Sequence, residues 1–174
     1  HVWPFLETGV VGSRAGTLLA AAGEMEITVI GKGGHAALPN ATIDPVITAA
    51  KIVCELQTIV SREIDPLEPA VVSVTTIHGG EAFNVIPQAV RLQGTVRSLT
   101  MPGLEFLQKR VREIATQIAA ANRCEAQVTF PGHAYPPTVN DAACWDSARA
   151  LIGEMLGPSA ALEVQPVMGG EDFA

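Results

Sequence analysis

The order of the patterned segments between residues 23 and 130 constrains the fold of this chain more strongly than any single motif. The expected strands span 23–31, 70–78, 89–98 and 125–130, and the expected helices span 44–62 and 102–121. Strand, helix, strand, strand, helix, strand is the order of the split βαβ unit, a four-stranded antiparallel sheet with two helices on one face. We therefore predict an α+β fold with a ferredoxin-like βαββαβ domain over residues 23–131.

Alternating side chains predict the strands, and spacings of three and four residues predict the helices. Asp44 and Pro45 suit the start of the first helix, and Thr100 suits the cap of the second. The apolar stripe expected to face the core in the first helix is Val46, Ile47, Ala50, Val53, Cys54, Leu56, Gln57 and Val60. In the second helix it is Leu104, Leu107, Val111, Ile114 and Ile118.

The two outer segments, 1–22 and 132–174, have a different sequence pattern from the central unit. We expect irregular, glycine-containing chain at 1–19 and an extended linker at 133–140. A helix is expected at 141–156 and a strand at 162–167. The chain starts at His1 rather than at a methionine. We expect these segments to be the two severed ends of a second domain, in a processed or truncated piece of a larger protein.

Composition and charge exclude several classes of protein. The net charge is −7 and no basic cluster offsets it, which argues against a nucleic-acid partner or an anionic membrane surface. Apolar residues make up 48% of the chain, enough for a core. The three cysteines, Cys54, Cys124 and Cys144, form no CxxC pair, and we expect buried or free thiols.

Residue chemistry alone offers only a small polar set. The glycine-rich loop 31–39 follows a strand and presents His35, and Asn84 and Arg97 are two further polar candidates. Imidazole and amide groups can donate to a developing oxyanion, and a guanidinium can bind a carboxylate. Each also has a simpler reading: His35 as a solvated loop residue, Asn84 as the cap of its own turn, and Arg97 as an exposed strand residue.

A longer ordered set of motifs is more specific than these residues. It runs through the whole chain as His1-Val2-Trp3-Pro4, Ser13-Arg14-Ala15-Gly16, Gly31-Lys32-Gly33-Gly34-His35-Ala36-Ala37-Leu38-Pro39, Asp44-Pro45, Phe83-Asn84-Val85-Ile86-Pro87, Gly94-Thr95-Val96-Arg97, Pro136-Pro137-Thr138-Val139-Asn140 and Met168-Gly169-Gly170-Glu171-Asp172-Phe173. This set resembles the metal-dependent aminoacylase/carboxypeptidase family, in the branch of hippurate hydrolases and plant indole-3-acetyl (IAA)-amino-acid hydrolases.

The resemblance implies a role for particular residues. His1 matches a metal ligand, and His35 matches a lid histidine that stabilises the tetrahedral intermediate, in dimeric members at the active site of the neighbouring subunit. Asn84 and Arg97 match lid residues that contact substrate, Arg97 at its carboxylate. A loop lining the substrate pocket corresponds to Gly169, Gly170 and Glu171. The chain departs from the family at Gln88, where an acidic residue is usual.

The resemblance also implies a parent protein. It would be an N-acyl-amino-acid amidohydrolase with a divalent metal, manganese or zinc, whose α/β metallohydrolase domain is interrupted by a lid that forms homodimers. The family's other ligands, a Cys-x-His segment, a Glu-Glu pair and a later histidine, have no counterpart in this chain, so we expect it to hold no metal stably and to be inactive alone. Plant-type relatives suggest an endoplasmic-reticulum lumen, and the cytoplasm is the other compartment the resemblance allows. No targeting segment decides between them. A non-enzymatic ferredoxin-like module that dimerises or binds a small ligand remains the alternative.

Overall fold

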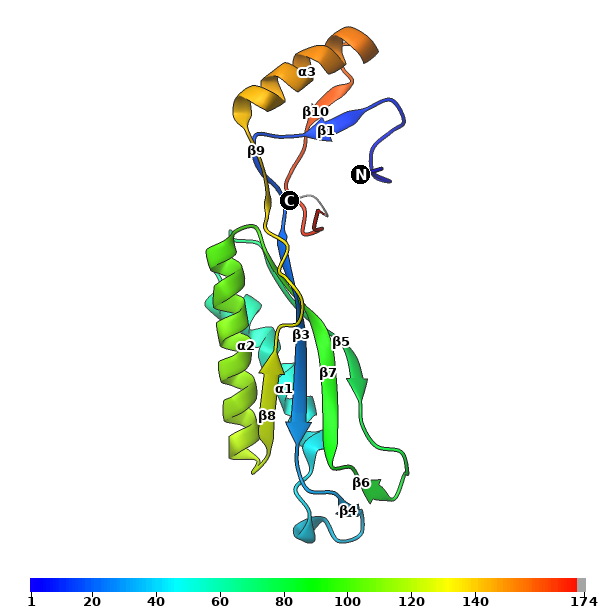
Figure 1. Cartoon of the computed structure of the whole chain (residues 1–174), viewed down its shortest axis with the longest axis vertical. Coiled ribbons are helices and arrows are strands. Elements are labelled where there is room, and N and C mark those ends of the chain that lie inside the picture. Colours follow the sequence, from blue (N-terminus) through cyan, green and yellow to red (C-terminus); the bar gives the residue numbers. More distant parts are fainter. Residues whose placement is uncertain (172–174) are drawn as a thin grey trace.

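The computed structural model describes residues 1–171 and shows an elongated molecule built around one sheet (Figure 1). The sheet consists of β3 (Ala21–Ile30), β5 (Ala70–His78), β7 (Ala89–Ser98) and β8 (Glu125–Thr129). The strand order is β5-β7-β3-β8 and every neighbouring pair is antiparallel. The predicted four-stranded antiparallel sheet is confirmed, and the predicted bounds of β5 and β7 are those observed.

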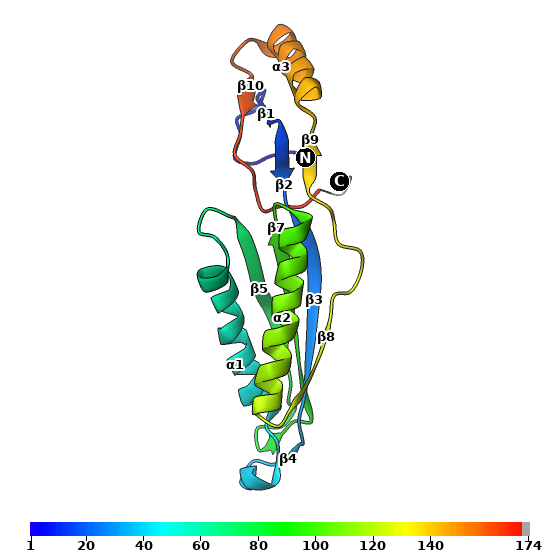
Figure 2. The ribbon, with the colours of Figure 1, turned by 90° about the vertical axis from the view of Figure 1, so that its left-hand side faces the viewer.

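Two helices cover one face of this sheet (Figure 2). The first, α1 (Pro45–Thr58), continues as the π-helical turn η2 (Ile59–Glu63), and the second is α2 (Met101–Ala121). Their predicted caps are confirmed, since the Asp44 carboxylate accepts hydrogen bonds from the amides of Val46 and Ile47 and the Thr100 hydroxyl accepts one from the Gly103 amide. α1 packs against β7, β3 and β5, and α2 packs against β8, β7 and β3.

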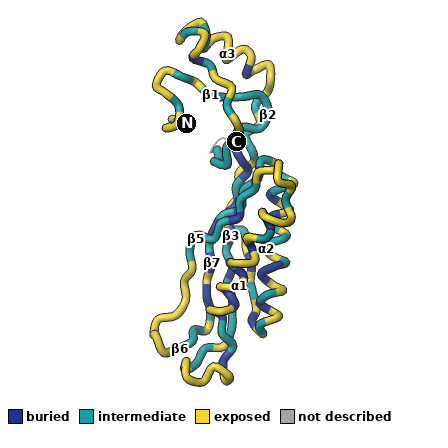
Figure 3. The backbone as a smooth tube through the Cα atoms, turned by 180° about the vertical axis from the view of Figure 1, so that it is seen from behind, coloured by how far each residue is buried: buried dark blue, intermediate teal, exposed yellow. Residues whose placement is uncertain are grey.

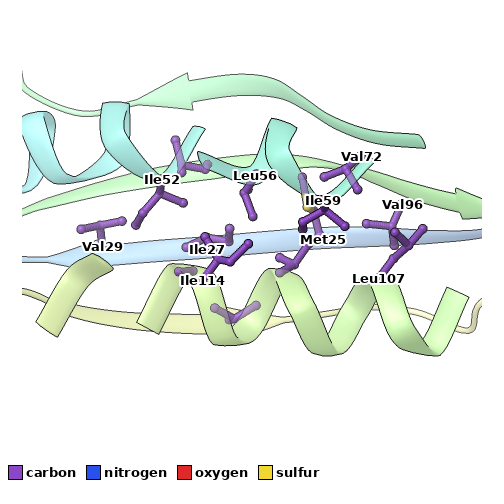
Figure 4. Close-up of a cluster of buried hydrophobic side chains, with 14 of the residues drawn as sticks. Met25, Ile27, Val29, Ile52, Leu56, Ile59, Val72, Val96, Leu107 and Ile114 are labelled. Carbon is purple, nitrogen blue, oxygen red and sulfur yellow. The ribbon is translucent and has the colours of Figure 1, made fainter. Parts of the chain in front are cut away.

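The core lies between the sheet and the helices, and the buried positions alternate along the strands (Figure 3). Its largest side chains come from both layers (Figure 4), among them Met25, Ile27, Val29, Ile52, Leu56, Ile59, Val72, Val96, Leu107 and Ile114. The predicted stripe of α2 is confirmed at Leu104, Leu107, Val111 and Ile114, with Ile118 partly buried.

The predicted stripe of α1 is confirmed only at Leu56, with Val53 partly buried, and is wrong at its other positions. The side chains that α1 and η2 bury are Pro45, Thr48, Ala49, Ile52, Leu56 and Ile59, of which only Leu56 belongs to the predicted stripe. Val46, Ile47 and Val60 are 44%, 55% and 37% exposed. The helix carries apolar residues on two faces, so periodicity alone could not show which face meets the sheet.

The outer segments pair with each other beyond one end of the sheet (Figure 1). Their elements are β1 (Val11–Ser13), β2 (Gly16–Leu19), β9 (Thr138–Asn140), α3 (Ala142–Leu156) and β10 (Ala161–Glu163). β1 pairs with β10 in parallel and β2 with β9 antiparallel, so the predicted linker ends in a strand. The strand predicted at 162–167 is observed as the shorter β10, which begins one residue earlier and ends at Glu163.

Cys54, Cys124 and Cys144 are all free thiols, as predicted. Among residues 1–171, no helix has the length and apolar character that crossing a membrane requires.

An ion pair joins the end of the first helical segment to the second helix. The Arg110 guanidinium donates to both carboxylate oxygens of Glu63, with Nε–Oε2 and Nη2–Oε1 distances of 2.6 and 3.0 Å. This hydrogen bonding holds the pKa of Glu63 below its ordinary value of 4.5. A lowered folded-state pKa means that the pair stabilises the fold above the unfolded-state pKa, and that this contribution is lost as the pH falls through the folded-state value.

We therefore predict that Glu63→Gln destabilises the fold at neutral pH by about 1 kcal/mol or less, because the pair is partly exposed. The difference from wild type should disappear at acid pH, where Glu63 is protonated in both states. Urea denaturation across the pH range measures it. The matched control is Glu68→Gln, since Glu68 has no ion pair in the described part of the chain. An equal loss at every pH would contradict the pairing.

Candidate functional site

His35 and Asn84 lie side by side at one tip of the molecule. A two-residue ladder joins β4 (Gly34–His35) to β6 (Val85–Ile86), and His35 is paired with Val85. Next to the ladder, the Ala36 amide donates to the Asn84 carbonyl at 2.9 Å. Both side chains are exposed, on a tip where most residues are exposed (Figure 3). The tip therefore presents an imidazole and an amide together to the outside.

The loop after His35 selects which ring nitrogen is free. The His35 Nδ1 accepts a hydrogen bond from the Ala37 amide at 3.1 Å. In the neutral imidazole the proton therefore sits on Nε2, which points away from this turn as a donor. A donor on an exposed, backbone-fixed ring suits the stabilisation of an oxyanion supplied from elsewhere.

Close packing, rather than an unusual backbone conformation, explains the glycines before His35. A Cβ at Gly31 would lie 2.2 Å from the Ile43 carbonyl oxygen, and one at Gly33 would lie 2.8 Å from that of Ile86. Gln88 fastens the same loop, because its amide donates to the Gly31 carbonyl at 2.7 Å and accepts from the Gly33 amide at 3.1 Å. A carboxylate at position 88 could not make the first of these bonds.

Arg97 lies at the opposite end of the sheet, in β7. It is half-buried, it is paired with Ala22 of β3, and its Nη1 donates to the Met168 carbonyl at 2.9 Å. The following residues, Gly170 and Glu171, line a cleft of about 340 Å³ together with Arg97. The sequence pattern placed Arg97 in a group with His35 and Asn84, but the fold does not bring the three together within one chain.

The predicted C-terminal loop and His1 meet at this second end. The Gly169 carbonyl accepts from the Ala20 amide at 2.8 Å, and Glu171 Oε2 lies 3.1 Å from His1 Nε2. His1, Gly169, Gly170, Glu171 and Arg97 are therefore neighbours. Asp172 and Phe173, the last residues of the same motif, lie outside the described residues.

The distance between the two ends follows from the strands. Ala22, opposite Arg97, and Ile30, just before the glycine loop, are eight residues apart in one uninterrupted strand. At about 3.4 Å a residue, the strand separates them by about 27 Å. One chain therefore cannot bring the His35–Asn84 pair and Arg97 to the same small substrate.

The predicted metal ligand His1 lacks enough neighbouring ligands to hold an ion within residues 1–171. His1 and Glu171 supply one imidazole and one carboxylate, and no group of three or more His, Cys, Asp or Glu side chains that could hold an ion occurs among residues 1–171. A catalytic zinc needs about three protein ligands. The described residues do not by themselves fit a catalytic metal.

Three residues of the Arg97 cleft escaped the sequence analysis. Glu24, His133 and Tyr135 also line it. Glu24 reads in sequence as an ordinary solvent-facing strand residue, and His133 and Tyr135 as parts of a linker. Only the cross-strand register and the return of the linker to β3 reveal their position.

Residues 20–123, which include the sheet-and-helix unit almost to its last strand, match the peptidase dimerisation domain of the M20 family. The chain belongs to the M20 peptidase family. Its dimerisation domain carries both the His35–Asn84 tip and Arg97.

Named relatives and solved structures agree with the family. The chain is 45% identical to the IAA-amino acid hydrolase ILR1-like 2 of Arabidopsis thaliana, over 100% of its own length and 40% of the relative. It is 42% identical to an N-acetyldiaminopimelate deacetylase of Leuconostoc citreum, over 99% of its own length and 44% of that relative. The chain thus spans less than half of these relatives.

A solved structure shows the same architecture. The YXEP protein of Bacillus subtilis, described as a dinuclear metal binding peptidase from the M20 family, superposes with a TM-score of 0.78 and 28% identity. The match covers 100% of this chain and 42% of that one. The fold expected from the resemblance is confirmed.

The glycine loop of the dimerisation domain yields a direct test. Gly31→Ala would place a Cβ against the Ile43 carbonyl, so the loop that carries His35 must move, and we expect a loss of about 1–3 kcal/mol. Gly153→Ala is the control, because its nearest neighbour would be 3.9 Å away within helix α3. It should be neutral or stabilising by up to about 1 kcal/mol. Urea denaturation gives both values, and equal effects would contradict the packing argument.

Proposed function

We propose that this chain supplies the dimerising lid and part of the substrate site of a metal-dependent N-acyl-amino-acid amidohydrolase acting on conjugates of the IAA-amino-acid type. The observation that carries the proposal is the separation of the His35–Asn84 tip from Arg97 within one chain. A complete site then forms between two copies of the chain, each contributing one end of its sheet. The names of the relatives support the reaction class.

The edge strand β5 is the proposed place of contact between the copies. It has nine residues, and within residues 1–171 it pairs with β7 alone and lies at one edge of the sheet. The other edge strand, β8, has five residues, and its Val128 carbonyl already accepts a hydrogen bond from Arg112 of α2 at 2.6 Å. A long open edge is a template for a further strand, whereas a short, engaged one is not.

The apolar flank of α1 lies beside this edge. Lys51 Nζ donates to the Asn122 side chain at the end of α2, so the flank of α1 that carries Lys51 faces α2. Val46, Ala50 and Val60 lie on the opposite flank, which faces away from α2 on the side of β5. Exposed apolar side chains next to an open strand edge favour burial against a second copy.

Twofold symmetry would then bring the His35–Asn84 tip of one copy toward the Arg97 end of the other. A twofold axis perpendicular to the sheet makes two β5 strands antiparallel and keeps both helical layers on the same side. Each sheet then points its His35–Asn84 tip toward the end of its partner where Arg97 lies. The homodimer inferred from the dimerisation domain thus acquires a specific geometry.

The roles proposed for the residues follow from their chemistry. Arg97 binds the substrate carboxylate, and Gly169, Gly170 and Glu171 line the same pocket. From the other copy, the His35 Nε2–H donates to the oxygen that becomes negative when water adds to the amide carbonyl, and the Asn84 amide adds a second polar contact.

The metal and the domain boundaries belong to the same proposal. His1 would be one ligand of a divalent metal, manganese or zinc, whose remaining ligands this chain does not provide. Residues 1–22 and 132–174 would be parts of the catalytic domain, with the lid at 23–131. The pairing of β1 with β10 and of β2 with β9 supports this division, since both ladders join the two outer segments.

The proposed interface can be broken by one charge. Val46→Asp, on the exposed flank of α1, should convert the dimer into monomers, because burying an unpaired carboxylate is unfavourable. Sedimentation velocity measures the change. The control is Leu151→Asp on α3, at a side chain of similar size that is 58% exposed. A dimer that survives Val46→Asp would contradict this use of α1.

Mixing two inactive variants of the whole enzyme tests the shared site. His35→Ala and Arg97→Ala should each remove nearly all amide hydrolysis as homodimers. In the mixed dimer, one site keeps Arg97 from one copy and His35 from the other, so equal mixing should restore about a quarter of wild-type activity. No restoration, with mixed dimers demonstrated by mass spectrometry, would contradict the proposal. No wild-type hydrolysis at all would favour a non-enzymatic module.

A further inference from the structure

The Arg97 cleft contains a carboxylate that the proposed reaction does not use. Glu24 lies opposite Thr95 in the β3–β7 ladder, two pairs along from Ala22 and Arg97. Residues two apart in a strand share a face, so Glu24 and Arg97 are diagonal neighbours on the face of the sheet that the helices leave open. Both line the same cleft.

Arg97 and Glu24 do not form an ion pair with each other. Arg97 donates one N–H to the Met168 carbonyl, and no carboxylate lies within ion-pairing distance of its guanidinium among residues 1–171. Glu24 makes no hydrogen bond or ion pair through its side chain within the same residues. Beside Glu171 and His133, the cleft therefore holds a cation, Arg97, and an anion, Glu24, that each have bonding capacity left for a ligand among the described residues.

The wall facing them is fixed by backbone pairing. The Ala22 amide donates to the Tyr135 carbonyl at 3.1 Å, and the Tyr135 amide donates to the Ala22 carbonyl at 2.9 Å. This pairing holds the linker that bears His133 and Tyr135 beside β3, where both residues line the cleft. Glu24 is exposed and lines this formed cleft.

A ligand that fills this cleft must satisfy both charges. A substrate with only a carboxylate would satisfy Arg97 but would desolvate Glu24 without giving it a partner, which is unfavourable. A substrate that also carries an ammonium group would compensate both. We infer that Glu24 makes the cleft selective for N-acyl amino acids whose side chain bears an ammonium group. The inference rests on the proposed function and names the substrate class of that same site.

A matched control lies on the same strand. Glu26 is two residues further along β3 on the same face, but its carboxylate is already paired with Arg91, and it does not line the cleft. Glu26→Gln therefore removes the same charge at nearly the same place without touching the proposed contact.

The test compares two substrates that differ in charge, with the whole enzyme. Nα-acetyl-lysine carries the ammonium, and Nα-acetyl-norleucine has a side chain of similar length without it. We expect wild type to prefer the lysine conjugate in kcat/KM. Glu24→Gln should reduce kcat/KM for the lysine conjugate about fivefold and leave the norleucine conjugate within about twofold. Glu26→Gln should leave the preference unchanged.

The possible outcomes separate this inference from the proposed function. An identical preference in wild type and Glu24→Gln would overturn the inference while leaving amide hydrolysis intact. If wild type hydrolyses neither these conjugates nor indole-3-acetyl-amino acids, the proposed function fails. NMR titration of the chain with the same two compounds then decides the selectivity of the cleft: tighter binding of the lysine conjugate that Glu24→Gln abolishes supports it, and equal binding overturns it.

Discussion

The uninterrupted pairing of β3 with β7 is the constraint on which the rest of this structure depends. Ten residue pairs, from Ala21–Ser98 to Ile30–Ala89, fix two long strands in one register. The pairing positions Arg97 and Glu24 at one end and begins the glycine loop at the other. Because paired strands of this length are stiff, the two ends keep their separation, and the site proposed above needs a second copy of the chain.

A second copy meets that need with the same elements. The open edge of β5 and the exposed flank of α1 lie on the side of the sheet away from β8, whose edge is short and engaged by Arg112. An antiparallel association reverses one sheet against the other. In the proposed dimer the tip with His35 faces the end with Arg97, so that dimerisation and substrate binding would be one event rather than two.

Much of this fold was predictable from local patterns. The alternation of apolar and polar side chains predicted the four strands of the sheet, and the caps Asp44 and Thr100 predicted where the two helices begin. Periodicity failed for α1, because its apolar residues cover two faces and only the packed structure separates core from flank. It also failed for β9, since that strand exists through pairing with β2, far away in sequence. For the site, the motifs identified His35, Asn84 and Arg97, but their separation and the position of Glu24 depend on the cross-strand register.

Paramagnetic relaxation between two copies of the chain tests the central claim most directly. One copy of the chain contains no ¹⁵N and carries a nitroxide on the cysteine introduced by Glu81→Cys, near Asn84. In this copy the exposed Cys54 and Cys144 are replaced by serine. This copy is mixed with a ¹⁵N-labelled copy that has no nitroxide, at a concentration where the sample is dimeric. If the site is shared between two chains, the amide signals of Gly169 and Gly170 disappear in the ¹⁵N-labelled copy. Full intensity at these two amides in the mixed dimer would contradict a site shared between two chains.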